Sequence, residues 1–273
     1  MEKISFLGPE GTFSHEAASK FNAEIIPYCT IQAIMESIES GECSKGLVPI
    51  ENSLEGPVNI TLDLLAHNFD LMIESEVVIS ISHNLLAKPN TKIEDITDVY
   101  SHSQALAQCQ PYIEKLNVRK HFTSSTTLAA EKVLDLDNAA AIGSLKAADK
   151  YGLGVLDKNI QINDDNETRF VVLSKKDHIP TGHDKTSILF SLFNDAESGA
   201  LYKILKLFAE ENINLTKIES RPSKNKLGTY IFFADLEGHR KDEKIDKVLK
   251  EVKSMTSSFK LLGSYPIFLR EIE

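Results

Sequence analysis

The sequence predicts an α/β fold up to about residue 175 and a smaller α+β unit after it. In the first part, short apolar runs repeatedly precede turns rich in Gly, Pro, Ser or Asn, and helical periodicity follows each turn. After residue 185 the order becomes strand, helix, strand, strand, helix, strand. The 273 residues suffice for two domains, because single cores usually stop growing at roughly 250 to 300 residues.

Four strand-turn-helix units are predicted in the first part. The strands and the helices that follow them are Ile4–Leu7 with Ser14–Phe21, Gly46–Ile50 with Val58–Ala66, Asp98–Tyr100 with a helix through Ile113, and Ala139–Ile142 with a helix to Tyr151. Ser14 is the expected N-cap of the first helix. Ligands of open α/β sheets bind beyond the carboxyl ends of strands, so the polar turns are candidate site segments.

The turn segments carry backbone and side-chain groups suited to small anions. Three of them are GPEGTFSHEAA (Gly8–Ala18), PIENSLEGPV (Pro49–Val58) and SHSQALAQC (Ser101–Cys109). A further segment, SSTTLAAE (Ser124–Glu131), is a cluster of hydroxyl side chains before an Ala-rich helix. In the third segment, Gln104 and Gln108 lie one helical turn apart on the same face. Each segment is also compatible with ordinary helix capping or a tight turn.

The rest of the chain follows a different pattern. The segment after Ser174, up to Lys185, contains Pro180 and Gly182 and has no apolar periodicity, which indicates a linker. The predicted strands beyond it are Thr186–Phe193, Leu215–Glu219, Tyr230–Leu236 and Lys260–Tyr265. The predicted helices are Ser198–Glu211, with Leu201, Leu205 and Phe208 on one face, and Lys241–Met255, with Ile245, Val248, Leu249 and Val252.

Net charge, histidine spacing and the motifs present argue against several classes of partner and cofactor. Thirty Lys and Arg against forty Asp and Glu give a formal charge of -10, which argues against a general nucleic-acid or anionic-membrane surface. The isolated histidines His67, His83, His102 and His121 show no metal-ligand spacing and are expected at the surface or satisfied in the core. No Walker or GxGxxG loop is present, so we expect neither a metal nor a cofactor.

The expected compartment is the cytoplasm. The start of the chain turns polar too soon for a signal peptide, and no apolar run is long enough to cross a bilayer. The three cysteines, Cys29, Cys43 and Cys109, form no CxxC pair and cannot all pair within one chain. Reduced thiols are therefore expected.

Seven motifs, taken together and in order, resemble the prephenate dehydratase family over nearly the whole chain. They are GPEGTFS, VPIENSLEG (Val48–Gly56), SHSQALAQC, SSTTLAA, NETRF (Asn166–Phe170), ESGAL (Glu197–Leu201) and LTKIESRP (Leu215–Pro222). The last two resemble phenylalanine-binding motifs of the family's C-terminal ACT domain. The departures are Ser103, where proline is common, and Tyr202, where valine is usual. The chain begins directly at the dehydratase strand, so the monofunctional form is expected.

The resemblance implies two α/β lobes around a cleft, like the periplasmic type II binding proteins, followed by a ferredoxin-like βαββαβ ACT domain. The expected catalytic domain spans residues 1–176, with lobe 1 at about 1–80 and 161–176 and lobe 2 at about 81–160. Residues 177–185 would be the linker and residues 186–273 the ACT domain.

The implied activity is that of a hydro-lyase of phenylalanine biosynthesis, which converts prephenate to phenylpyruvate with loss of carbon dioxide and the ring hydroxyl. Thr168 resembles the catalytic group that donates a hydrogen bond or a proton to the departing hydroxyl, and Asn52, Ser101 and Gln108 match positions linked to activity. The expected substrate-binding residues are Gly8, Gly11, Thr12, Glu51, Ser53, His102, Gln104, Ser124, Ser125, Thr126, Arg169 and Phe170. Strand alternation turns Arg169 away from Thr168, which favours a structural role for the arginine.

In the ACT domain, the resemblance implies an allosteric L-phenylalanine site at a subunit interface of a homodimer or homotetramer. The expected site residues are Gly199, Ala200, Leu201, Asn214, Leu215, Glu219, Ser220, Arg221 and Pro222. An arogenate dehydratase remains an alternative, since its substrate differs from prephenate only in carrying an amino group in place of the keto group. A non-catalytic amino-acid sensor is the other alternative, and the TRF, ENS and SHxQ segments count against it because a sensor needs no leaving-group chemistry.

Overall fold

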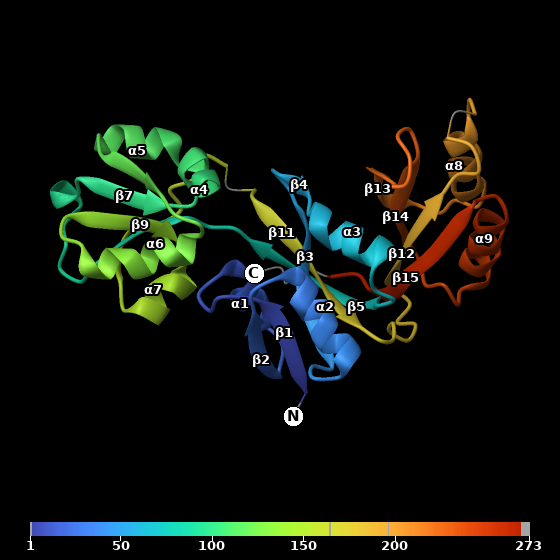
Figure 1. The fold of residues 1–273 in the computed structure, drawn as a ribbon, viewed down its shortest axis with the longest axis horizontal. Helices are drawn as coiled ribbons and strands as arrows, with labels where there is room; N and C mark the ends of the chain where they lie inside the picture. The colour runs from blue at the N-terminus through green and yellow to red at the C-terminus, as the bar shows by residue number, and fades with distance from the viewer. Residues whose placement is uncertain (1, 164, 196, 269–273) are drawn as a thin grey trace. The chain divides into compact units, whose positions relative to one another are not determined.

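A computed structural model describes residues 2–163, 165–195 and 197–268 of the chain (Figure 1). These residues divide into two compact units, the first made of the described residues up to Val58 and within Val78–Phe170, and the second of Asn59–Val77 and the described residues from Val171 onward. The strands β5 (Met72–Ser80) and β11 (Glu167–Ser174) run from one unit into the other. This grouping follows packing contacts, and the domain boundaries expected at residues 176 and 186 stay a prediction.

The first sheet has the strand order β2-β1-β3-β11-β5. Its parallel strands are β1 (Lys3–Leu7), β2 (Glu24–Tyr28) and β3 (Lys45–Asn52), and the short β4 (Gly56–Pro57) pairs with the end of β3. Helices α1 (Phe13–Ala18) and α2 (Ile31–Ser40) pack on these strands, with Ile34 and Ile38 of α2 buried. Gly46 permits this approach, because a Cβ there would lie 2.5 Å from Cγ2 of Ile34.

The second sheet has the order β10-β6-β9-β7-β8 and carries helices on both faces (Figure 1). Its strands are β6 (Asn84–Ala87), β7 (Asp98–Ser101), β8 (Arg119–Phe122), β9 (Ala139–Gly143) and β10 (Gly154–Asp157). The helices are α4 (Ser103–Gln108), α5 (Gln110–Leu116), α6 (Thr126–Lys132) and α7 (Leu145–Tyr151), with 3₁₀ turns at Ile93–Asp95 and Val133–Asp135. Consecutive residues Leu85 and Leu86 belong to different core clusters, because side chains alternate between the faces of a strand.

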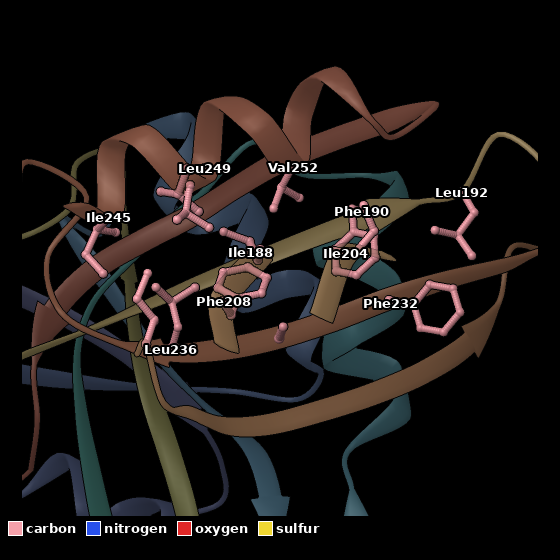
Figure 2. Packing of buried hydrophobic residues seen from close by; sticks show 13 residues of the cluster. Ile188, Phe190, Leu192, Ile204, Phe208, Phe232, Leu236, Ile245, Leu249 and Val252 are labelled. Atoms are coloured by element: carbon pink, nitrogen blue, oxygen red, sulfur yellow. The ribbon is translucent and has the colours of Figure 1, made fainter. Parts of the chain in front are cut away.

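The third sheet lies in the second unit and has the order β13-β14-β12-β15, with all neighbours antiparallel. Its strands are β12 (Asp184–Ser191), β13 (Leu215–Pro222), β14 (Tyr230–Glu237) and β15 (Ser258–Pro266). Side chains of helices α8 (Ala200–Glu210) and α9 (Glu243–Ser254) pack with those of β12 and β14 in one buried cluster. Figure 2 shows Ile188 and Phe190 of β12 near Leu249 and Val252 of α9.

Helix α3 (Asn59–His67) also belongs to the second unit and contacts the third sheet through charged side chains. Arg221 of β13 donates two hydrogen bonds of 3.0 Å to the carboxylate of Asp63. The ammonium group of Lys260 donates to the carbonyl oxygens of Leu65, at 3.0 Å, and Phe69, at 2.6 Å. Lys260 therefore satisfies one carbonyl group in the last turn of this helix and one in the segment that follows it.

The structure confirms the fold class predicted from the sequence and corrects three details. The first helix starts one residue earlier than expected, because Thr12 is the N-cap in place of Ser14 and accepts a hydrogen bond from the His15 N–H. The helix expected through Ile113 ends at Gln108 and a new one starts at Gln110, next to a proline that has no N–H to continue the first. In α8 the buried residues are Ile204 and Phe208, and Leu205 is only partly buried. No helix in the described parts of the chain has the length and apolarity needed to cross a bilayer.

Candidate active site

A cleft in the first unit collects polar side chains from the ends of several strands and the starts of three helices. Its volume is about 360 Å³, which lies within the usual range for small-molecule sites. The lining residues are Leu7, Thr12, Phe13, Ser14, Asn52, Ile81, His83, His102, Gln104, Ala105, Gln108, Ser124, Ser125, Thr126, Asn166 and Thr168. Most of them follow the carboxyl ends of β1, β3 and β7, which the sequence predicted as strands, and of β8, which it did not.

Asn52 occupies the end of β3 and has a fixed orientation. Its side-chain oxygen accepts hydrogen bonds from the backbone N–H groups of Leu54, at 3.0 Å, and Glu55, at 2.9 Å. Its amide nitrogen lies 2.9 Å from Asn166 Oδ1, 3.0 Å from the Glu167 carbonyl oxygen and 2.9 Å from Thr168 Oγ1. Because backbone N–H groups can only donate, they determine which end of the Asn52 amide is the donor.

Thr168 lies on β11 beside Asn52 and lines the cleft. Its hydroxyl oxygen accepts a hydrogen bond from Asn52, so its own hydrogen is left to donate elsewhere. No acceptor for that hydrogen occurs among the side chains that the structure describes. The Asn52–Thr168 pair therefore presents a neutral hydroxyl donor to a ligand in the cleft.

Gln108, Asn166 and His83 form a second group of polar side chains in the same cleft. Asn166, which is only 1% exposed, donates from Nδ2 to Oε1 of Gln108 at 3.0 Å, and Nε2 of His83 lies 2.9 Å from the same oxygen. Burial lowers the pKa of His83, and the hydrogen bond to Gln108 opposes that shift only in part. The sequence predicted Gln108 but not His83, because an isolated histidine carries no local sign of a partner 25 positions away.

Other predicted residues also reach the cleft. Thr12, His102, Gln104, Ser124, Ser125 and Thr126 line it. Thr12 and His102 are the N-caps of α1 and α4, and Ser125 caps α6 by accepting a hydrogen bond of 3.0 Å from the Leu128 N–H. The hydroxyl cluster before α6 therefore combines helix capping with a position at the cleft, which the sequence had left as alternatives.

Several predicted residues do not line the cleft, and their binding or catalytic roles stay predictions. They are Gly8, Gly11, Glu51, Ser53, Ser101, Arg169 and Phe170. Ser101 is fully buried and its hydroxyl donates to the Ile142 carbonyl oxygen at 2.7 Å, which joins β7 to β9. The guanidinium group of Arg169 lies 3.7 Å from the carboxylate of Glu51. This pairing fits the structural role expected for an arginine that alternates away from Thr168.

No Asp, Glu, Lys or Arg lines the cleft in the described parts of the chain. These same parts contain no cluster of three His, Cys, Asp or Glu side chains that could hold a metal ion. An anion in the cleft would therefore be held by hydroxyl, amide and backbone donors, as anions are at helix N-termini. A smaller hollow of about 240 Å³ shares Gln104 and Gln108 with the cleft and is otherwise lined by Leu54, Glu55, Ala107, Gln161, Ile162 and Asn163.

The predicted effector residues lie in the second unit. Gly199 is the N-cap of α8 with a φ of 79°, and Ala200 and Leu201 begin that helix. Asn214 donates to the Glu237 carboxylate at 2.9 Å, and Leu215 packs against the core cluster of the third sheet. On β13, alternation places Glu219 and Arg221 on one face and Ser220 and Pro222 on the other, so only part of this motif can face one ligand.

The Arg221 side chain is engaged by α3. Burial by itself would raise the pKa of Asp63, but the hydrogen bonds from Lys224 and Arg221 outweigh burial and hold that pKa below its ordinary value. The ion pair is therefore charged at neutral pH. It joins a residue of the predicted effector motif to the helix that follows the Asn52 turn in the chain.

Fold and cleft together define an α/β protein with a small-molecule site beyond its strands, joined to a ferredoxin-like domain. Residues 4–178 match the family described as prephenate dehydratase, and residues 188–254 match the ACT domain. The chain belongs to the prephenate dehydratase family.

Three comparisons illustrate the relationship. The chain is 46% identical to a bifunctional chorismate mutase/prephenate dehydratase of Aquifex aeolicus, over 97% of this chain and 73% of that protein. It is 43% identical to a prephenate dehydratase of Methanocaldococcus jannaschii, over 97% of this chain and 98% of that protein. The solved structure of a prephenate dehydratase from Arthrobacter aurescens in complex with L-Phe is similar with a TM-score of 0.89 at 35% identity, covering 97% of this chain and 90% of that one.

Proposed function

We propose that this protein converts prephenate to phenylpyruvate, with loss of carbon dioxide and the ring hydroxyl. The observation that carries the proposal is the Asn52–Thr168 pair, in which an amide donor occupies the threonine oxygen and leaves the hydroxyl hydrogen available in the cleft. The reaction needs a group of this kind, because hydroxide is a poor leaving group and a hydrogen bond to the departing oxygen stabilises the charge that develops on it.

The electron flow requires no redox partner. The bond between the ring carbon and its carboxylate breaks, its electron pair completes the aromatic ring, and the carbon–oxygen bond on the opposite side of the ring breaks. Carbon dioxide leaves, and the departing hydroxide takes up a proton to become water. Thr168 is expected to donate a hydrogen bond to that oxygen, while the rest of the cleft holds the substrate in place.

The neutral lining of the cleft favours prephenate over arogenate. Two carboxylates and a keto group are all hydrogen-bond acceptors, and they match the hydroxyl donors at Ser124, Ser125 and Thr126 and the amide donor of Gln108. Arogenate carries an ammonium group in place of the keto group, and a buried ammonium group is stabilised by a carboxylate partner. The described lining offers no carboxylate.

A two-substrate assay tests the proposal. Purified protein is incubated with prephenate or with arogenate, and phenylpyruvate and phenylalanine are followed. Turnover of prephenate with a higher kcat/KM than arogenate is expected. The reverse preference would favour an arogenate dehydratase, and no turnover of either compound would favour the amino-acid sensor.

We further propose that L-phenylalanine, the pathway end product, inhibits this protein by binding at an ACT interface in a homodimer or homotetramer located in the cytoplasm. The ACT match and the L-Phe complex of the Arthrobacter relative support the effector. Exposed apolar side chains of the second unit support association, since Phe193 is 73% and Tyr202 is 66% exposed. Inhibition requires that phenylalanine bind a less active state more tightly. Sedimentation with and without phenylalanine, alongside inhibition curves, tests both claims.

A further inference from the structure

A chain of hydrogen bonds with fixed direction ends at Gln108. The backbone N–H groups of Leu54 and Glu55 force Asn52 to accept at its oxygen and donate from its nitrogen. Asn52 then donates to Asn166 Oδ1 at 2.9 Å, and Asn166 in turn donates from Nδ2 to Gln108 Oε1 at 3.0 Å. Each amide therefore takes its orientation from the one before it, starting from the backbone.

The side-chain oxygen of Gln108, which accepts from Asn166, is also contacted by the ring of His83. Its Nε2 lies 2.9 Å from Gln108 Oε1, and an amide oxygen can only accept, so Nε2 must carry the hydrogen. The residue is held in place by its backbone, whose N–H donates to Gln161 Oε1 and whose carbonyl accepts from the Ile160 N–H, both at 2.9 Å. The ring also makes an edge contact with Phe13, with the centroids 5.9 Å apart.

The second ring nitrogen of His83 indicates that the ring is neutral. His83 is only 4% exposed, and its Nδ1 has no hydrogen-bond partner among the described residues. A hydrogen on Nδ1 would make the ring a buried cation without a counter-charge, and burial accordingly lowers the pKa of this histidine. The neutral tautomer with its hydrogen on Nε2 satisfies the contact with Gln108 without burying a charge.

We propose that His83 is a positioning residue of the dehydratase reaction, which fixes the Gln108 amide so that its amino group is offered to the substrate. Two donors, Asn166 Nδ2 and His83 Nε2, occupy the Gln108 oxygen, and the structure shows no acceptor for the amino group among the described side chains. The substrate part of this inference rests on the proposed function, because prephenate presents mainly acceptors.

The energetic reason lies in the cost of turning the amide over. With both donors present, a flipped Gln108 would set its amino group against two N–H groups. Its oxygen would then face the carboxylate of a bound substrate. Without His83, the flipped amino group would face one N–H group, that of Asn166, in place of two. His83 therefore increases the fraction of molecules in which Gln108 presents a donor to the cleft.

A double-mutant cycle tests this role. His83→Leu, which keeps an apolar side chain but removes the donor, is expected to lower kcat/KM for prephenate about tenfold, the scale of one hydrogen bond to a charged group. His83→Gln, whose amide nitrogen can occupy the place of Nε2, is expected to recover most of that loss. In a Gln108→Ala background, His83→Leu is expected to change kcat/KM by less than about twofold.

Two results of the cycle would overturn the inference. One is a tenfold loss from His83→Leu that persists in the Gln108→Ala background, because His83 would then act independently of Gln108. The other is a His83→Gln variant as impaired as His83→Leu, which would indicate that the ring shape and not the donor matters. Thermal unfolding of every variant shows whether the compared proteins are folded.

A measurement on the free protein separates this inference from the proposed function. In ¹⁵N-histidine NMR spectra at pH 7.5, His83 is expected as a neutral ring with hydrogen on Nε2 and none on Nδ1. An imidazolium, or the tautomer with hydrogen on Nδ1, would overturn the inference whether or not prephenate is turned over. Failure to convert prephenate would overturn the proposed function and leave the tautomer assignment to stand on its own measurement.

Discussion

Replacing Thr168 by valine is expected to lower kcat for prephenate by at least about a hundredfold while leaving the protein folded. Valine keeps the shape of the side chain and removes only the hydroxyl, and loss of one donor to a developing negative charge costs about 10² to 10³ in rate. The hydroxyl is the right group to remove because Asn52 occupies its oxygen and leaves its hydrogen available in the cleft.

The effect of this substitution on stability should be much smaller. Asn52 keeps two other acceptors, Asn166 Oδ1 at 2.9 Å and the Glu167 carbonyl at 3.0 Å, so its amide nitrogen is not left unpaired. The expected loss is the net value of one hydrogen bond, about 1 kcal/mol, which corresponds to a shift in Tm of roughly 2 to 4 °C for a domain of this size. At the assay temperature the variant would remain almost entirely folded.

The assay follows phenylpyruvate formation at saturating prephenate, with thermal unfolding measured on the same preparations. Thr168→Ser is the matched control, since it keeps the hydroxyl and removes the methyl group, and it should retain far more activity than Thr168→Val. A kcat for Thr168→Val within about threefold of the parent protein would refute the role of the hydroxyl. So would a serine variant as slow as the valine variant.

Three other outcomes are expected. Arg221→Gln breaks the pair with Asp63 and should raise the phenylalanine concentration for half-inhibition about tenfold, with a smaller effect on kcat; inhibition curves measure this. Lys185→Met leaves the carboxylate of Glu76, only 2% exposed, without its ammonium partner at 2.9 Å and should lower the free energy of unfolding by about 3 kcal/mol in denaturant titrations. The pKa of His83 is lower in the folded protein than in the unfolded chain, so protonation favours the unfolded chain. The contribution of neutral His83 to stability is therefore present above about pH 6.5 and is lost as the pH falls below that value. His83→Gln should flatten the pH dependence of Tm below about pH 6.5.

Each of these outcomes has a control. Unchanged inhibition in Arg221→Gln would remove that residue from the effector response. Lys203→Met breaks an exposed pair with Glu197 and should change stability by less than about 1 kcal/mol, so an equal loss in both lysine variants would contradict the importance of burial. Identical Tm profiles for the parent and His83→Gln between pH 5 and 7 would contradict the assigned pKa direction.

Local patterns were sufficient for much of the fold. The apolar positions of α9, Ile245, Val248, Leu249 and Val252, were predicted and are buried, because a helix repeats its faces every three to four residues whatever it packs against. Helix boundaries were less predictable. The choice of Thr12 over Ser14 as N-cap depends on which of two nearby hydroxyls accepts the hydrogen bond. The helix break at Cys109 precedes a proline that has no N–H to continue the first helix.

In the candidate site, too, some features were predictable from the sequence and others were not. Sequence motifs predicted Asn52, Gln108 and Thr168, and alternation along β11 separated Thr168 from Arg169, which lies beside Glu51. The direction of the hydrogen bonds could not be predicted, because it begins at backbone N–H groups of one turn and passes through Asn166.

By itself the sequence determined the α/β class, the order of the polar turns and the family to which those turns belong, because these depend on residues close together in the chain. Only the tertiary structure placed Asn52 against Thr168, 116 positions away, and His83 against Gln108. The first pair depends on the register between strands of one sheet, and the second on burial that lowers the pKa of the histidine and keeps its ring neutral. Neither can be read from a few neighbouring residues.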